Sequence, residues 1–119
     1  MKTRETLHVF SRNEFRKWLS ENHSRKTEIW LTLFKKISGK QTFSANDARE
    51  EAICYGWIDS RTKSIDEQRF AMRFTPRHKE SPWSTYNKEL ALKMLRAGKI
   101  TEAGKAVLPL DLLKVPGAG

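Results

Sequence analysis

Cysteine and histidine are scarce in this 119-residue sequence, and their scarcity excludes two classes of small protein. The single cysteine, Cys54, cannot form a disulfide within the chain. The three histidines, His8, His23 and His78, are far apart and lack the spacing of zinc ligands. We therefore expect neither a disulfide framework nor a metal site, and no motif in the sequence indicates a bound cofactor.

Long apolar runs are absent as well. No stretch approaches the ~20 apolar residues that a helix needs to cross a bilayer. The first residues, 1–5, lead into an alternating strand pattern and not into the apolar centre of a signal peptide. The sequence thus predicts a cytoplasmic protein that has no membrane partner.

Acidic residues are outnumbered. The chain has 14 Asp and Glu against 23 Lys and Arg, which gives a formal net charge of +9. This balance favours anionic partners, such as a phosphorylated metabolite, a nucleic acid or an acidic protein surface. Hydrophobic residues make up 38% of the chain, with four Trp and six Phe among them, which is enough for a compact core. The length is that of one domain.

Capping residues mark the starts of the predicted helices. Residues 11–14 read Ser-Arg-Asn-Glu, which is a capping box, and residues 44–47 repeat the pattern ahead of a helix that would end near Gly56. Ser81-Pro82 predicts the start of a third and longest helix, because proline is favoured at the first helical position. Thr101 can cap a short fourth helix.

Alternating and continuous apolar runs predict the strands. Residues 7–9 form a short strand, and the apolar run 29–34 is typical of a central strand buried on both faces. Residues 57–65 and 69–75 form the best hairpin. We therefore expect an α+β fold over residues 1–108, with about four strands in an antiparallel or mixed sheet and three to four helices mainly on one face. Residues 109–119 are predicted to be a flexible tail.

The loop of the hairpin determines which side chains face the core. A three-residue loop, 66–68, puts Phe70, Met72 and Phe74 on the core face, whereas a two-residue loop would mix charged side chains with them. The polar face of the hairpin then carries Trp57, Asp59, Arg61, Lys63, Arg69 and Arg73.

This polar face suggests an anion site. Arg61 lies opposite Arg73 in the predicted register, and a like-charge pair costs stability unless a carboxylate or an anion lies between them. Asp59 alone cannot balance these two arginines and Lys63, and Arg77 follows directly after the strand. The alternative is a solvated sheet face whose long side chains spread into water.

Two tryptophans and an asparagine complete the candidate site. Alternation puts Trp57 on the polar face, near any ligand, whereas Trp83 begins an apolar helical stripe and fits the core as well as a ligand wall. Asn87, three residues after Ser84, suits either a cleft or a helix cap. Cys54 has acidic neighbours and is expected to be a buried, unreactive thiol.

Several of these segments occur together in a known family. Gly56-Trp57-Ile58-Asp59, Lys63-Ser64-Ile65-Asp66, Arg73-Phe74-Thr75-Pro76-Arg77, and Ser81 with Trp83-Ser84 and Asn87 stand in the chain in that order. From about Phe10 to Gly104 the sequence resembles the YdeI/OmpD-associated proteins, which are also labelled bacteriocin-protection proteins.

The resemblance implies an α+β domain, a context of stress or bacteriocin resistance, and no established reaction. Members often continue into a further helical segment, and residues 108–113 resemble its opening, so we expect the first domain only, lacking most of that segment. Relatives have been linked to iron chaperones of the frataxin type, but a chain of charge +9 without an acidic ridge is a poor cation carrier.

The leading hypothesis is a non-catalytic domain that binds a small anion or anionic metabolite. The predicted ligand-binding residues are Trp57, Asp59, Lys63, Arg73, Arg77, Trp83 and Asn87. A nucleic-acid-binding module is the first alternative. A small-molecule hydrolase or transferase that uses Asp59 and Lys63 is the second, although no nucleophile, base and oxyanion donor can be assembled from the sequence.

Overall fold

The computed structural model describes residues 6–78 and 80–113, apart from the side chains of residues 110 and 113. Its elements are β1 (Thr6–His8), α1 (Arg12–Asn22), β2 (Ile29–Phe34), the 3-10 helix η1 (Lys36–Ser38), α2 (Ala45–Cys54), β3 (Trp57–Ser64), β4 (Arg69–Pro76), α3 (Thr85–Arg96), α4 (Glu102–Lys105) and α5 (Leu110–Leu113). The sheet order is β1-β2-β4-β3; β1 runs parallel to β2 and the other neighbours are antiparallel. The predicted α+β fold with a mixed four-stranded sheet is confirmed.

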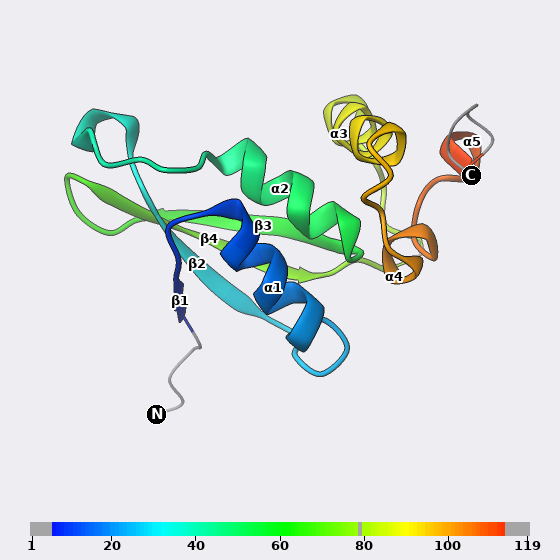
Figure 1. Cartoon of the computed structure of the whole chain (residues 1–119), viewed down its shortest axis with the longest axis horizontal. Helices are drawn as coiled ribbons and strands as arrows, with labels where there is room; N and C mark the ends of the chain where they lie inside the picture. The colour runs from blue at the N-terminus through cyan, green and yellow to red at the C-terminus, as the bar shows by residue number, and fades with distance from the viewer. Residues whose placement is uncertain (1–5, 79, 114–119) are drawn as a thin grey trace.

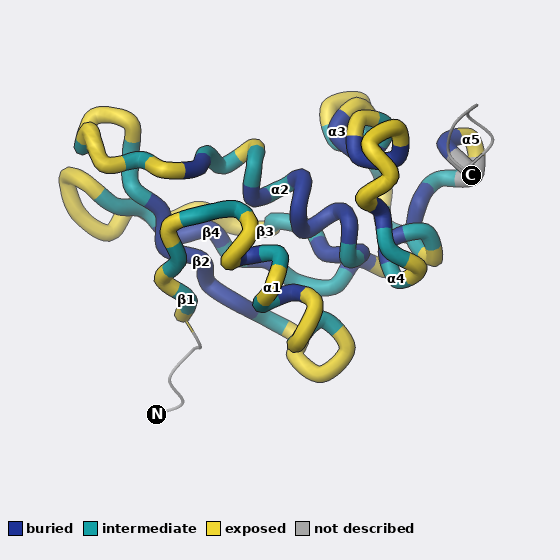
Figure 2. The backbone as a smooth tube through the Cα atoms, in the orientation of Figure 1, coloured by how far each residue is buried: buried dark blue, intermediate teal, exposed yellow. Residues whose placement is uncertain are grey.

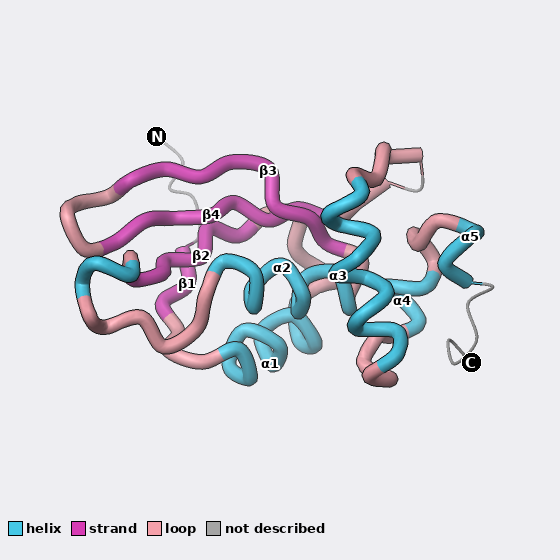
Figure 3. The backbone as a smooth tube through the Cα atoms, turned by 90° about the horizontal axis from the view of Figure 1, so that it is seen from above, coloured by secondary structure: helices cyan, strands magenta, loops and turns pink. Residues whose placement is uncertain are grey.

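The helices lie on one side of the sheet and at one of its ends. Helices α1 and α2 cover one face, which we call the helix face, and α3, α4 and α5 stand beyond the end of the sheet (Figures 1 and 3). The opposite face, which we call the outer face, is covered by no helix of the described residues (Figure 3). None of the described helices is long and apolar enough to cross a membrane.

The main core lies between the sheet and the first two helices, where the chain is most buried (Figure 2). It contains Phe15, Leu19, Ile29, Leu31, Leu33, Phe43, Ala48, Ala52, Trp57, Met72 and Phe74. The small side chains of Ala48 and Ala52 are fully buried and let α2 approach the sheet closely. Phe70, Met72 and Phe74 face this core, as the three-residue loop predicts.

A second apolar cluster joins α2 to the C-terminal helices. It contains Ile53, Cys54, Leu90, Ala91, Met94, Leu95, Ile100, Leu108 and Leu112. Gly104 is required here, because a Cβ atom at this position would lie 2.4 Å from the Cys54 carbonyl oxygen. Residues 109–113 fall in the predicted tail, yet they include α5, whose Leu112 is buried in this cluster; residues 114–119 lie outside the described residues.

Three predicted helix starts are confirmed and one is wrong. Ser11, Ser44 and Thr101 cap α1, α2 and α4 through their hydroxyl oxygens. Helix α3, however, begins at Thr85 and is capped by Ser84, whose Oγ accepts from the Asn87 amide. Ser81 caps no helix, because its Oγ accepts from the His78 amide and closes a turn.

A β-bulge changes the predicted register at the start of the hairpin. Arg61 pairs with Arg73 as predicted, but Asp59 pairs with Phe74, so Ser60 is an extra residue in β3. The predicted position of Trp57 on the polar face is therefore wrong: the bulge reverses the direction of the preceding side chains, and Trp57 is 1% exposed. Its ring packs edge-on against Trp18 of α1, with centroids 5.8 Å apart.

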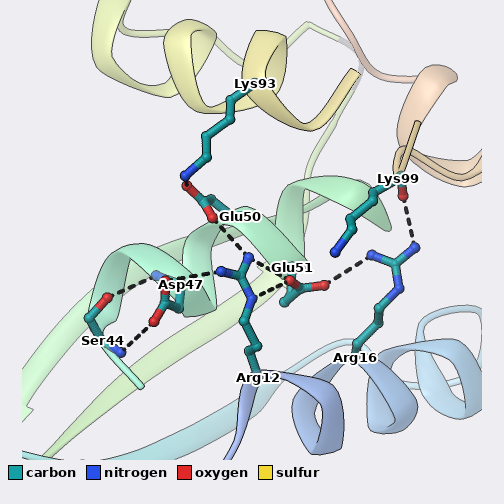
Figure 4. A network of polar contacts seen from close by, with 8 residues as sticks. All are labelled: Arg12, Arg16, Ser44, Asp47, Glu50, Glu51, Lys93 and Lys99. Carbon is teal, nitrogen blue, oxygen red and sulfur yellow. Dashed lines mark hydrogen bonds and ion pairs between the residues drawn. The ribbon is translucent and has the colours of Figure 1, made fainter. Parts of the chain in front are cut away.

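A polar network ties the helices together above the core (Figure 4). Two almost fully buried carboxylates of α2, Glu50 and Glu51, each accept from Arg12 of α1 at 2.8 and 2.7 Å. Arg16 donates to Glu51 at 2.9 Å, and Lys93 of α3 donates to Glu50 at 2.9 Å. Each buried carboxylate thus has two cationic partners, which is the condition under which buried charge is tolerated.

Replacing Arg12 by Met should destabilise the protein, because it leaves two buried carboxylates with fewer cationic partners. We expect a loss of about 2 to 3 kcal/mol of unfolding free energy in urea denaturation, below the usual cost of breaking a buried pair because Arg12 itself is partly exposed. The control is Lys17→Met on the exposed side of α1, which should change stability by about 0.5 kcal/mol or less. Equal losses in both variants would contradict a structural role for the network.

Candidate functional site

The sheet separates the predicted site residues into two groups. Lys63 and Arg73 lie on the outer face, next to Arg61. Asp59 lies on the helix face, where its carboxylate accepts from Arg49 of α2 at 3.2 Å. The predicted arrangement with Asp59 and Arg61 on one face is therefore wrong, for the same reason as for Trp57: the bulge at Ser60 lies between them. Arg77, Trp83 and Asn87 gather where β4 ends and α3 begins.

The outer face is hollowed. The hollow has a volume of about 660 Å³ and is lined by Thr6, Trp30, Thr32, Arg61, Lys63, Ser64, Ile65 and Ala71. Cross-strand pairing explains why these residues lie together. Trp30, Arg73 and Arg61 are neighbours across three adjacent strands, and Thr32, Ala71 and Lys63 form the next such row. Trp30, Thr32 and Ala71 come from the two central strands and form the floor, whereas Arg61 and Lys63 come from the edge strand β3.

The charge of Arg73 is compensated by a residue that the sequence did not point to. Its Nε donates to the Glu28 carboxylate, and its Nη1 donates to Ser60 Oγ at 3.0 Å. Glu28 directly precedes β2, 45 residues away in sequence, and only the pairing of β2 with β4 brings it here. The repulsion between Arg61 and Arg73 is thus relieved by Glu28 and not by Asp59.

Arg61 and Lys63 differ from the other cations of this face. Arg69 of this face is paired with Asp66 at 2.9 Å, and Lys35, close to the hairpin loop, donates to Ser64 Oγ at 2.7 Å. The Arg69 guanidinium and the backbone amides of the turn lower the pKa of the Asp66 carboxyl. By contrast, the exposed side chains of Arg61 and Lys63 form no ion pair or hydrogen bond with any residue that the structure describes.

The predicted site residues that are not on the outer face lie near α2 and near the start of α3. Arg49 bridges Asp59 and Asn46, donating to the Asn46 side-chain oxygen at 2.9 Å, and the Tyr86 hydroxyl of α3 donates to the same oxygen. Arg77 is buried, and its guanidinium lies 3.9 Å from the centroid of the Trp83 ring. Trp83 is therefore a half-buried partner of Arg77 and precedes α3 instead of beginning its apolar stripe.

The positions of Asp59, Lys63 and Cys54 do not favour acid-base or nucleophilic catalysis. Asp59 and Lys63 lie on opposite faces of β3, so they cannot meet on one substrate. Cys54 is fully buried, and this burial raises the pKa of its thiol to about 11, which keeps it protonated near neutral pH. Within the described residues, no three His, Cys, Asp or Glu side chains lie close enough to hold a metal ion.

The comparison with known families identifies the chain. Residues 7–107 match the family described as a domain of unknown function, DUF8412, and the chain belongs to this family. No curated protein and no solved structure matches the sequence. The match does not test the resemblance to the YdeI/OmpD-associated proteins, which stays a prediction.

The buried thiol of Cys54 should react slowly in the folded protein. Its pKa is raised from 9.0 to about 11 in the folded state, so the neutral thiol predominates up to that pH, and the reactive thiolate is both rare and covered. We expect a chromogenic disulfide reagent at pH 8 to label Cys54 at least about tenfold more slowly in buffer than in denaturant. Equal labelling rates would show that the thiol is accessible and would reopen a nucleophilic role.

Proposed function

We propose that this member of the DUF8412 family binds a small anionic ligand in the hollow of its outer face. The observation that carries the proposal is the placement of Arg61 and Lys63, which are adjacent on one face of β3, line the hollow and have no ionic partner among the described residues. Two such cations next to each other repel, and an anion between them relieves this repulsion.

The shape and lining of the hollow suit a small molecule better than a simple ion. A volume of about 660 Å³ lies within the usual range for a metabolite site. The floor combines the indole of Trp30, the hydroxyl of Thr32 and the methyl group of Ala71, and Ile65 adds an apolar wall. Such a lining favours a ligand that has an anionic group for the two cations and a flat or apolar part for the floor.

Arg73 would act as a positioning residue in this site. Its guanidinium is held by Glu28 and Ser60 beside Arg61, so it gives the site a fixed side without needing the ligand as a partner. A cytoplasmic location, as the sequence predicts, would supply phosphorylated metabolites of this kind.

Replacing Arg61 and Lys63 should reduce a specific stabilisation by phosphate. At a phosphate concentration ten times the dissociation constant, binding to the folded state adds about 1.4 kcal/mol, which raises Tm by about 4 to 8 °C. We expect this rise, measured against sodium chloride of equal ionic strength, to be clearly larger in the wild type than in the double variant Arg61→Ser/Lys63→Ser.

The matched control is Lys17→Ser/Arg96→Ser, which removes the same charge from exposed positions on α1 and α3. Phosphate also stabilises folded proteins without a site, so the difference between the two double variants is the decisive quantity. An equal phosphate effect in both double variants would leave the outer face as ordinary solvated surface.

Single-stranded nucleic acid is the second candidate ligand, favoured by one observation. Phe10 is 58% exposed and stacks on Phe34 with ring centroids 6.3 Å apart, at the end of the outer face where Arg69 pairs with Phe34. An exposed aromatic ring beside a basic sheet face is the arrangement on which bases stack in single-strand-binding proteins.

If nucleic acid binds here, the affinity for a fluorescent twelve-residue oligothymidine should depend steeply on salt and on two kinds of residue. Arg61→Ala and Arg73→Ala should weaken binding and reduce the salt slope, because each removes a phosphate contact. Phe10→Ala should cost about 1 to 3 kcal/mol through lost stacking, whereas Tyr86→Ala, an exposed aromatic on the helix side, should have no effect. Anisotropy that does not change at low salt would exclude this candidate.

A further inference from the structure

Arg77 is a buried arginine whose hydrogen-bonding capacity is largely unused. It follows β4 at the end of the sheet and is 6% exposed. Its Nη1 donates to the Pro82 carbonyl oxygen at 3.0 Å, and the Trp83 ring covers the guanidinium plane. Nε and Nη2 are buried and have no hydrogen-bond partner among the residues that the structure describes. These two nitrogens form one edge of the guanidinium, the edge that binds both oxygens of a carboxylate or phosphate group.

No carboxylate of the described residues forms an ion pair with this edge. Burial lowers the pKa of Arg77, and the charge of Asp59 only partly offsets this effect. The Asp59 carboxylate itself is bonded to Arg49. The contrast with Arg12 and Arg16 is direct, because those arginines donate to buried carboxylates. Since a guanidinium does not lose its proton in proteins, Arg77 is a buried positive charge that forms no ion pair with the described residues.

The N-terminus of α3 adds to the positive potential at this point. Trp83, which lies on Arg77, directly precedes Ser84, the cap of this 12-residue helix. The first turn of α3 contains no acidic residue. Ser84 Oγ satisfies the Asn87 amide, whereas the amides of Thr85 and Tyr86 belong to the first turn, which has no intrahelical acceptors. The N-terminus of a helix thus lies close to a buried arginine whose Nε and Nη2 have no hydrogen-bond partner among the described residues.

We propose that Arg77 and the N-terminus of α3 form a second anion site, which takes a carboxylate or phosphate group presenting two oxygens to Nε and Nη2. This site is separate from the outer-face hollow, because it lies at the end of the sheet where α3 begins. Both nitrogens are buried in the structure, so side chains around them have to move when the anion enters. Trp83, which lies on the guanidinium plane and is half-buried, precedes the helix, so its movement does not require α3 to unfold.

The test is an NMR titration of the Arg77 Nε–Hε signal, assigned by its loss in Arg77→Lys. The protein carries Arg61→Ser/Lys63→Ser, so that the outer-face hollow does not contribute. Sodium phosphate, sodium acetate and sodium chloride are added at equal ionic strength. We expect a saturable shift of this signal with phosphate or acetate and none with chloride. A response to acetate alone identifies a carboxylate ligand, and a response to phosphate alone identifies a phosphate ligand.

Thermal unfolding gives a second, independent readout. The parent protein here is again the variant Arg61→Ser/Lys63→Ser. Adding Arg77→Met keeps the apolar part of the side chain and removes its buried charge, so the Tm in chloride should be several degrees higher than that of the parent. The same variant should lose the Tm gain that phosphate or acetate gives the parent. The matched control is Arg49→Met, which removes the neighbouring paired arginine and should lower Tm while keeping the anion-specific gain.

The proposal is overturned if the Arg77 signal shifts with neither anion, or shifts equally with chloride. It is also overturned if Arg77→Met keeps the full anion-specific gain in Tm. The outer-face proposal fails on a different result, namely a phosphate stabilisation that does not depend on Arg61 and Lys63. Both residues are absent from the protein used in the titration, so the two proposals are tested separately.

Discussion

The β-bulge at Ser60 is the constraint on which the arrangement of the outer-face hollow depends. With one extra residue in β3, Trp57 and Asp59 point to the helix face, and Arg61 and Lys63 point to the outer face. A straight strand would put Trp57 and Asp59 beside Arg61, withdraw a large ring from the core and bring a carboxylate to the basic hollow. Because of the bulge, the hollow keeps two cations without an acidic neighbour on the same strand.

The distribution of charge follows from this geometry. On the helix side, the carboxylates of Asp47, Glu50, Glu51 and Asp59 each accept from at least one arginine. Their partners lie on α1 and α2, so the ion pairs also hold these helices together above the sheet. Arg61, Lys63 and Arg77 form no ion pair with the described residues, and they are the cations that we propose bind ligands.

The candidate site was only partly predictable from the sequence. Alternation correctly placed Lys63 and Arg73 on the outer face, because the register beyond the bulge follows the three-residue loop. Glu28 could not be found, since its contact with Arg73 depends on which strand lies beside β4. Arg49 could not be found either, because the predicted register aimed Asp59 away from α2. A bulge without glycine or proline leaves no local signal in the sequence.

The sequence by itself determined the elements and the fold class. Capping residues and the periods of apolar side chains act over a few neighbouring residues, so they predict helices and strands without knowledge of the rest of the chain. Only the tertiary structure decided which charges meet. The pairing of Arg73 with Glu28 and the ion pairs of Arg12 with Glu50 and Glu51 depend on contacts between elements distant in sequence. Such contacts are selected by packing of the whole domain, which local patterns do not encode.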